Sequence, residues 1–169
     1  MKNSKFFTIG LLTCLFLLSA AFVSAKMPNF AGTWTLNEVK SPMPENGFRM
    51  GSTKITATQD ELKLSTERTY KGQNGEDMTS KEVYTFDGKE CESLFFQTMK
   101  RKSTATWSAD GKVLTINSVT LFERDGETME MKSYETWKLS ADSNELTMES
   151  SITTPNGDMK STCVYDKAK

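Results

Sequence analysis

The feature that most limits how this chain can fold is a series of turn signals between residues 74 and 157. They are Asn74-Gly75, Asp87-Gly88, Asp110-Gly111, Asp125-Gly126, Asp142-Ser143-Asn144 and Asn156-Gly157. Both central residues of a type I′ hairpin turn need positive φ, which Asn, Asp and Gly tolerate best. The intervening segments are rich in Thr, Val, Ile and aromatic residues, and none has apolar residues at sustained helical spacing. The pattern predicts a meander of antiparallel strands.

Apolar and polar residues alternate within several of these segments, which predicts strands with one buried face. Between residues 128 and 139, for example, Met129, Met131 and Trp137 share one side of the strand, and charged residues share the other. Between residues 113 and 122 the apolar positions change parity. We expect a β-bulge near Asn117-Ser118 to cause this change.

The chain offers eight to ten such strands. An open sheet of that width leaves two unpaired edges and an exposed apolar face, so we expect the sheet to close or fold over. A two-layer β-sandwich is the alternative, but it usually needs longer crossing connections than the sequence offers after residue 60. We therefore predict an all-β fold, a closed antiparallel up-and-down barrel.

The first 25 residues have the organisation of a secretory signal peptide. Lys2 and Lys5 form a positive start, an apolar run follows, and Val23-Ser24-Ala25 offers small residues for a signal peptidase. We predict cleavage after Ala25 and a periplasmic or secreted protein. The alternatives are an uncleaved membrane anchor and a lipoprotein at Cys14, whose preceding residues match a lipobox poorly. The mature chain, 26–169, is long enough for one domain and has no second apolar stretch that would span a bilayer.

Composition excludes several functions. The chain contains no histidine, so Ser-His-Asp and Cys-His catalytic sets and imidazole zinc sites are impossible. The mature chain has 19 basic and 22 acidic residues once Lys2 and Lys5 are removed, and no clustered basic face, which argues against nucleic acid as a partner. Cys91 and Cys163 are too few for a thiolate zinc site, and we expect them to be unbonded. We expect neither a metal nor a cofactor.

Two segments resemble a known family. The strand that contains Gly32-Thr33-Trp34 resembles the opening strand of lipocalins and fatty-acid-binding proteins, in which Gly-x-Trp is a signature and the tryptophan closes the bottom of the barrel. The end of the chain, 161–167, is similar to the last strand of the fatty-acid-binding proteins. The mature chain also resembles small exported bacterial proteins described as lipocalin-like. The resemblance implies a calycin-type barrel that holds a small ligand.

The departures from that family concern the ligand. The segment between Val39 and Ser52 contains prolines and glycine and cannot house the two helices that cover a fatty-acid-binding protein. The arginine that grips a ligand carboxylate in that family aligns with Cys163, although Tyr165 matches its partner. The resemblance therefore supports the fold more than a fatty-acid ligand.

The candidate ligand site follows from inward-facing positions. Methionines suit irregular apolar ligands, although they also fill ordinary cores. Arg68 lies on an apolar side and would bind an anionic group, pair with Glu135 or point out at the rim. The predicted ligand-binding residues are Trp34, Arg68, Tyr84, Phe86, Met129, Met131, Trp137, Met148 and Tyr165.

Three functions remain. The favoured one is an exported, non-catalytic barrel that binds a small hydrophobic or amphiphilic molecule such as a lipid. The second is an envelope or secreted interaction or inhibitor module with a filled barrel, which meets a protein partner through loop 41–51, where Met43, Phe48 and Met50 are apolar. The third is a hydrolase that uses carboxylates, but no pair of acidic residues is singled out by its surroundings. A cavity would favour the first function and a filled barrel the second.

Overall fold

The computed structural model describes residues 27–44, 47, 49–72, 74–124, 126–154 and 157–169. Within these ranges it contains ten strands and no helix, and therefore no helix that could cross a membrane. The strands are β1 (Gly32–Leu36), β2 (Lys54–Gln59), β3 (Lys63–Lys71), β4 (Asp77–Thr85), β5 (Cys91–Phe95), β6 (Met99–Trp107), β7 (Val113–Arg124), β8 (Glu127–Leu139), β9 (Glu145–Thr154) and β10 (Gly157–Lys167). The signal-peptide segment lies outside the described residues, and cleavage after Ala25 stays a prediction.

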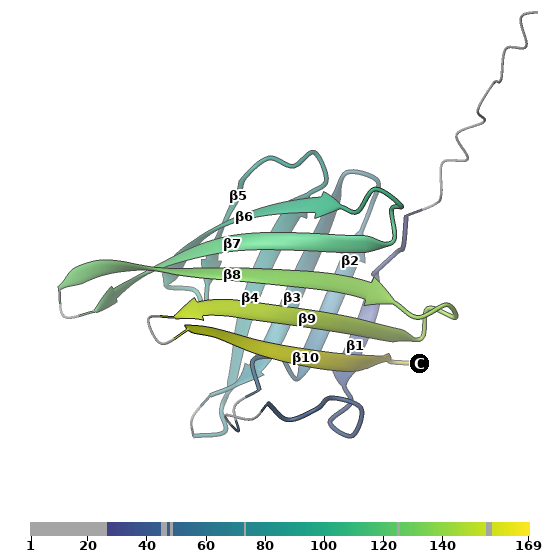
Figure 1. Cartoon of the computed structure of the whole chain (residues 1–169), viewed down its shortest axis with the longest axis horizontal. Helices are drawn as coiled ribbons and strands as arrows, with labels where there is room; N and C mark the ends of the chain where they lie inside the picture. Colours follow the sequence, from purple (N-terminus) through teal and green to yellow (C-terminus); the bar gives the residue numbers. More distant parts are fainter. Residues whose placement is uncertain (1–26, 45–46, 48, 73, 125, 155–156) are drawn as a thin grey trace, which may run out of the picture.

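The strands form one closed barrel. Each strand pairs antiparallel with the next strand in the chain, and β1 also pairs with β10, where Trp34 lies opposite Lys167. In Figure 1 the strands β7 to β10 cross in front of the more distant β2 to β4, as expected for a sheet that curls round on itself. The predicted all-β up-and-down barrel is confirmed, with ten strands, and the β-sandwich is excluded.

The predicted turn signals lie where the strands reverse. Ser143 has a φ of 58°, and the glycines of the other five signals also have positive φ. These glycines are Gly75, Gly88, Gly111, Gly126 and Gly157. An L-residue at such a φ is strained unless its side chain is small or polar, which is why these dipeptides identified the hairpins.

The β2–β3 and β5–β6 hairpins lack such a signal, and the second of them has an unusual turn. Between β5 and β6, Phe96 and Gln97 have φ values of 47° and 63°, as in a type I′ turn. The ring of Phe96 packs edge-on against Tyr70, with 5.1 Å between the centroids, and Tyr70 also contacts Phe95 at 5.9 Å. These aromatic contacts help to hold a turn that its residue types disfavour.

The predicted bulge in β7 is absent. Residues 113–124 of β7 each face one residue of β8 in an unbroken register, and the register with β6 is unbroken too. The buried positions simply continue along one face through Leu114, Ile116, Ser118 and Thr120. The expectation of a bulge near Asn117-Ser118 was wrong because the inner face of the barrel changes from apolar to polar at this level.

Aromatic side chains fill one end of the barrel. Phe30, which precedes β1, stacks on Trp107 with 5.7 Å between the centroids and meets Trp137 edge-on at 5.4 Å. Trp34 is fully buried, and its indole N–H donates to the Phe30 carbonyl at 2.8 Å. This end therefore contains the apolar core, and Trp34 lies where the family resemblance implied.

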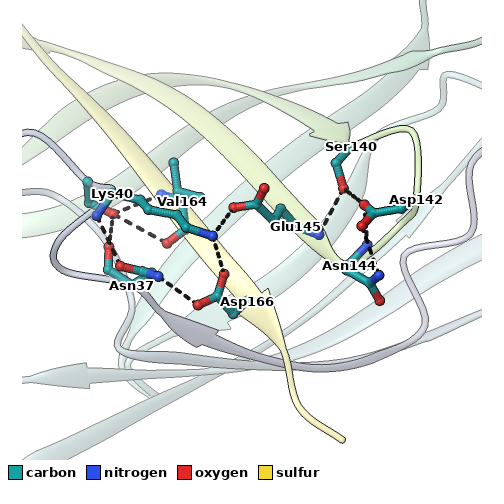
Figure 2. Close-up of polar contacts among 9 residues, drawn as sticks. Asn37, Lys40, Ser140, Asp142, Asn144, Glu145, Val164 and Asp166 are labelled. Carbon is teal, nitrogen blue, oxygen red and sulfur yellow. Dashed lines mark hydrogen bonds and ion pairs between the residues drawn. The ribbon is translucent and has the colours of Figure 1, made fainter.

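The segment between β1 and β2 is anchored to the outside of the barrel, beside the start of β9 and the end of β10. Figure 2 shows Lys40 between the carboxylates of Glu145 and Asp166, and Asn37 donating to Asp166 at 2.6 Å. The Ser41 hydroxyl accepts a hydrogen bond from the β10 backbone at 2.9 Å. These contacts fix the start of the segment, whose described residues contain no helix, as the sequence predicted.

Candidate functional site

The inside of the barrel is layered. Along the barrel axis from the apolar end, the inner face first becomes polar. Closer to the segment before β2 and the β5–β6 turn, it then carries methionines and aromatic residues. The buried polar residues of the strands are Thr66, Arg68, Ser80, Glu82, Arg101, Ser103, Ser118, Thr120 and Ser161. Charged side chains are almost never fully buried unless they are paired, so the partners of these residues decide what the layer does.

Arg68 is paired with Glu135. Its two terminal nitrogens each donate to one carboxylate oxygen of Glu135 at 2.9 Å, which is the bidentate geometry of a strong ion pair. The guanidinium also lies 5.0 Å from the ring centroid of Trp137, whose indole N–H donates to the same carboxylate at 3.2 Å. Of the three roles predicted for Arg68, the structure therefore supports pairing with Glu135.

Glu82 is the second acid of the layer. One oxygen accepts a hydrogen bond from Arg101 at 2.8 Å, and the other accepts from the Tyr84 hydroxyl at 2.6 Å and lies 3.6 Å from Arg68 Nε. Arg101 also donates to the Ser133 hydroxyl at 3.0 Å. The four charged groups and Tyr84 therefore form one network, which we call the charged layer.

The electrostatics of the charged layer follow from its pairing. Burial opposes ionisation of Glu135, but the charge and hydrogen bonds of Arg68 outweigh it and lower the pKa of Glu135 to about 2. Burial likewise opposes the charge on Arg68, but Glu135 and its other neighbours hold the pKa of Arg68 well above its usual value. Burial raises the pKa of Tyr84. Arg68 and Glu135 are therefore both charged, and Tyr84 stays a neutral donor.

The charged layer also crosses the weakest seam of the barrel. The ladder between β4 and β5 contains a single residue pair, Lys81 opposite Leu94, whereas every other neighbouring pair of strands has at least three. Glu82 belongs to β4 and Arg101 to β6, so their 2.8 Å ion pair spans β5 on the inside. This contact helps to close the barrel where the backbone ladder is short.

A cavity of about 100 Å³ lies between the charged layer and the loops. Arg68, Arg101, Ser133 and Glu135 belong to its wall. The other lining residues are Met50, Gly51, Ser52, Tyr70, Phe95, Met131, Met148, Ser150, Ile152, Cys163 and Tyr165. The cavity wall therefore combines charged and hydroxyl groups with apolar side chains.

The segment before β2 closes part of this cavity. Gly51 lies so close to β10 that a Cβ atom there would come within 2.5 Å of Cys163 Sγ and 3.3 Å of the Tyr165 hydroxyl. The Tyr165 hydroxyl is hydrogen-bonded to Ser52 at 3.3 Å. Burial raises the pKa of the Cys163 thiol, and Cys163 and Cys91 are both free, as predicted.

Not every predicted ligand-binding residue lines the cavity. Arg68, Met131, Met148 and Tyr165 do. Trp34, Phe86 and Trp137 belong to the apolar core, and Tyr84 is hydrogen-bonded to Glu82 in the charged layer. Met129 lies near the start of β8, before the residues that line the cavity, and is half-buried. The predicted list thus combines cavity wall, charged layer and core.

Sequence reasoning missed Glu82, Arg101 and Ser133. Glu82 lies two residues before Tyr84 on β4, and Arg101 has the same parity as Trp107 on β6, so alternation alone places both inside. That signal was present in the sequence.

A larger hollow of about 590 Å³ lies outside the barrel over β7 to β10. Exposed side chains such as Lys132, Tyr134 and Glu149 line it, and no buried charged residue reaches it. The chemistry that distinguishes this protein therefore lies inside the barrel. Among the described residues, no three or more Cys, Asp or Glu side chains are grouped so as to hold a metal ion.

The sequence matches no protein-family model and no curated protein. Among solved structures, it is similar to the zebrafish ileal bile acid-binding protein in complex with cholic acid. The TM-score is 0.51 at 18% sequence identity, over 82% of this chain and 98% of that protein. This chain therefore shares the closed antiparallel barrel fold of that protein.

Proposed function

We propose that this protein is an exported, non-catalytic barrel that binds a small, largely apolar molecule in the cavity above the charged layer. The observation that carries the proposal is the make-up of the cavity wall, which combines hydroxyl groups such as those of Ser133 and Ser150 with the apolar side chains of Met131, Met148 and Ile152. Such a wall complements a molecule with one polar end. The similar zebrafish structure contains cholic acid, which supports a barrel of this fold as a container for an amphiphile.

The size of the cavity limits the ligand. Its volume of about 100 Å³ is smaller than that of an engineered apolar cavity in another protein, about 150 Å³, which admits benzene. A lipid-sized ligand therefore needs Met50, Met131 and Met148 to move. Methionine has three rotatable bonds and adapts to irregular partners, so these side chains suit that rearrangement.

Export and lack of catalysis rest on separate observations. The sequence features of residues 1–25 support export. Arg68 and Glu135 engage each other in a bidentate pair, and Arg101 engages Glu82, so the charged groups beside the cavity are already occupied. An acid or base for a reaction needs a free proton site, which supports binding rather than catalysis.

Native mass spectrometry of protein purified from its own host tests the proposal directly, because a bound molecule adds a discrete mass. A cavity-filling variant, Met131→Trp, should lose that mass and also lose displacement of a fluorescent hydrophobic probe. The matched control is Lys132→Trp, which adds the same ring to the outer face of the same strand. Equal binding by both variants would contradict a ligand site in the cavity.

The filled-barrel alternative, a protein-interaction module, is favoured by one observation. Val39 and Met43, in the segment between β1 and β2, are 98% and 61% exposed. Of the three apolar residues predicted to act in loop 41–51, Met43 is exposed, Met50 lines the cavity, and Phe48 lies outside the described residues. A photo-crosslinking residue at position 39, used in the exporting host, should capture a defined protein if this segment binds one. The same residue at Lys54 is the control.

A further inference from the structure

We infer that the cavity selects amphiphiles whose polar end is uncharged, such as an alcohol or a primary amide, and rejects carboxylates. The inference rests on the proposed ligand-binding function and specifies its ligand class. It follows from how the two buried arginines are used, taken together with the groups that are left free on the cavity wall.

The first step is the charge of the layer. Arg68 and Arg101 contribute two positive charges, and Glu82 and Glu135 contribute two negative charges, so the charged layer is neutral as a whole. Among the cavity-lining residues, the cationic ones are Arg68 and Arg101 alone. A ligand carboxylate would lose its hydration on entering and meet no net positive charge in return.

The second step is the hydrogen bonding of the guanidiniums. Both terminal nitrogens of Arg68 donate to Glu135, and those of Arg101 donate to Glu82 and Ser133. Of the guanidinium nitrogens of Arg68 and Arg101, the Nε atoms are buried without a hydrogen-bond partner, and Arg68 Nε lies 3.6 Å from Glu82. A bidentate grip on a ligand carboxylate through both terminal nitrogens therefore requires that Glu135 be displaced from Arg68, or Glu82 and Ser133 from Arg101.

The third step is the supply of neutral groups. Ser133 accepts a hydrogen bond from Arg101, which leaves its own proton free to donate toward a ligand. Ser150 donates to the Ser161 carbonyl at 3.4 Å and keeps its acceptor capacity, and the Ser52 and Tyr165 hydroxyls also line the wall. Hydroxyl groups that both donate and accept match an alcohol or an amide.

The experiment compares three ligands with the same eight-carbon skeleton, namely 1-octanol, octanamide and octanoate. Their affinities are measured at pH 7 by displacement of an uncharged fluorescent probe. We expect the alcohol and the amide to bind at least about tenfold more tightly than octanoate, a difference that is readily measured. Octanoate binding as tight as octanol would overturn the inference and leave the proposed function standing. Failure of all three probes, with no molecule bound to the host-purified protein, would overturn both.

A variant reverses the predicted preference. Glu135→Gln removes one negative charge, so the layer becomes positive beside Arg68, and the ratio of octanoate affinity to octanol affinity should rise about tenfold. Glu149→Gln is the control, because it makes the same change in net charge on an exposed residue of the outer face. The double variant Arg68→Met/Glu135→Met keeps the layer neutral and should still reject octanoate. Absence of a gain in folded Glu135→Gln, or a gain in the double variant, would overturn the electrostatic argument.

Discussion

Replacing Arg68 with methionine should destabilise the barrel by several kcal/mol. Methionine keeps an unbranched apolar stem but removes the guanidinium, so Glu135 loses two hydrogen bonds of 2.9 Å and Glu82 loses an ion-pair partner at 3.6 Å. Breaking a buried ion pair by removing one partner costs about 3–5 kcal/mol. Two charge-assisted hydrogen bonds at about 1.5–3 kcal/mol each give a similar total. Glu135 is 14% exposed, so the lower half of that range is expected.

Urea denaturation followed by tryptophan fluorescence measures this loss, because Trp137 lies directly against Arg68. For a urea dependence of about 2 kcal/mol per molar, a loss of about 3–4 kcal/mol lowers the midpoint by about 1.5–2 M. The control is Lys81→Met, which removes an exposed pair with Glu67 and should change stability by no more than about 1 kcal/mol.

The double variant Arg68→Met/Glu135→Met separates pairing from packing. Removing both charges leaves no stranded carboxylate, so most of the stability should return, since buried pairs replaced by apolar groups of similar volume are often neutral or stabilising. A loss below about 1 kcal/mol for Arg68→Met alone would refute the buried-pair argument. An equal loss in the single and double variants would show that the stem and not the charge carries the effect.

Four other measurements test further parts of the structure. The pKa of Glu135 is lowered from 4.5 to about 2, so its ionised form contributes about 3 kcal/mol to the free energy of unfolding. This contribution is present above pH 4.5 and is lost as the pH falls toward 2, and Glu135→Gln should flatten this part of the curve of stability against pH. Gly51→Ala should cost about 1–3 kcal/mol through its clash with Cys163, and less in a Cys163→Ala background. Non-reducing peptide mapping should find Cys91 and Cys163 unlinked, with native alkylation slower at the buried Cys163. The intact mass of the exported protein should show an N-terminus at Lys26, and an uncleaved chain or a lipid on Cys14 would contradict export by the predicted route.

Much of the fold follows from local sequence. The Asn-Gly and Asp-Gly dipeptides predicted the hairpins because few other residues accept positive φ, and the alternation on β8 and β9 predicted the buried face because side chains alternate strictly along a strand. The number of strands and the absence of long connections predicted closure of the sheet. The turn at Phe96-Gln97 was not predicted, because it is supported by an aromatic contact with Tyr70 from another hairpin and not by its own residue types.

The site was predictable only in part. Parity placed Arg68 and Glu135 inside, but it does not measure how far apart two inner residues lie across a barrel. The pairing of Arg68 with Glu135 joins β3 to β8, and that of Arg101 with Glu82 spans β5, so both depend on the curvature and diameter of the closed sheet. The parity change in β7 was misinterpreted for the same reason, because a polar inner face at Ser118 and Thr120 makes sense only beside a charged layer contributed by other strands. Local sequence determined which side chains face inward, and the tertiary structure alone decided that their charges cancel, because cancellation depends on distances across the barrel and not on the order of residues along a strand.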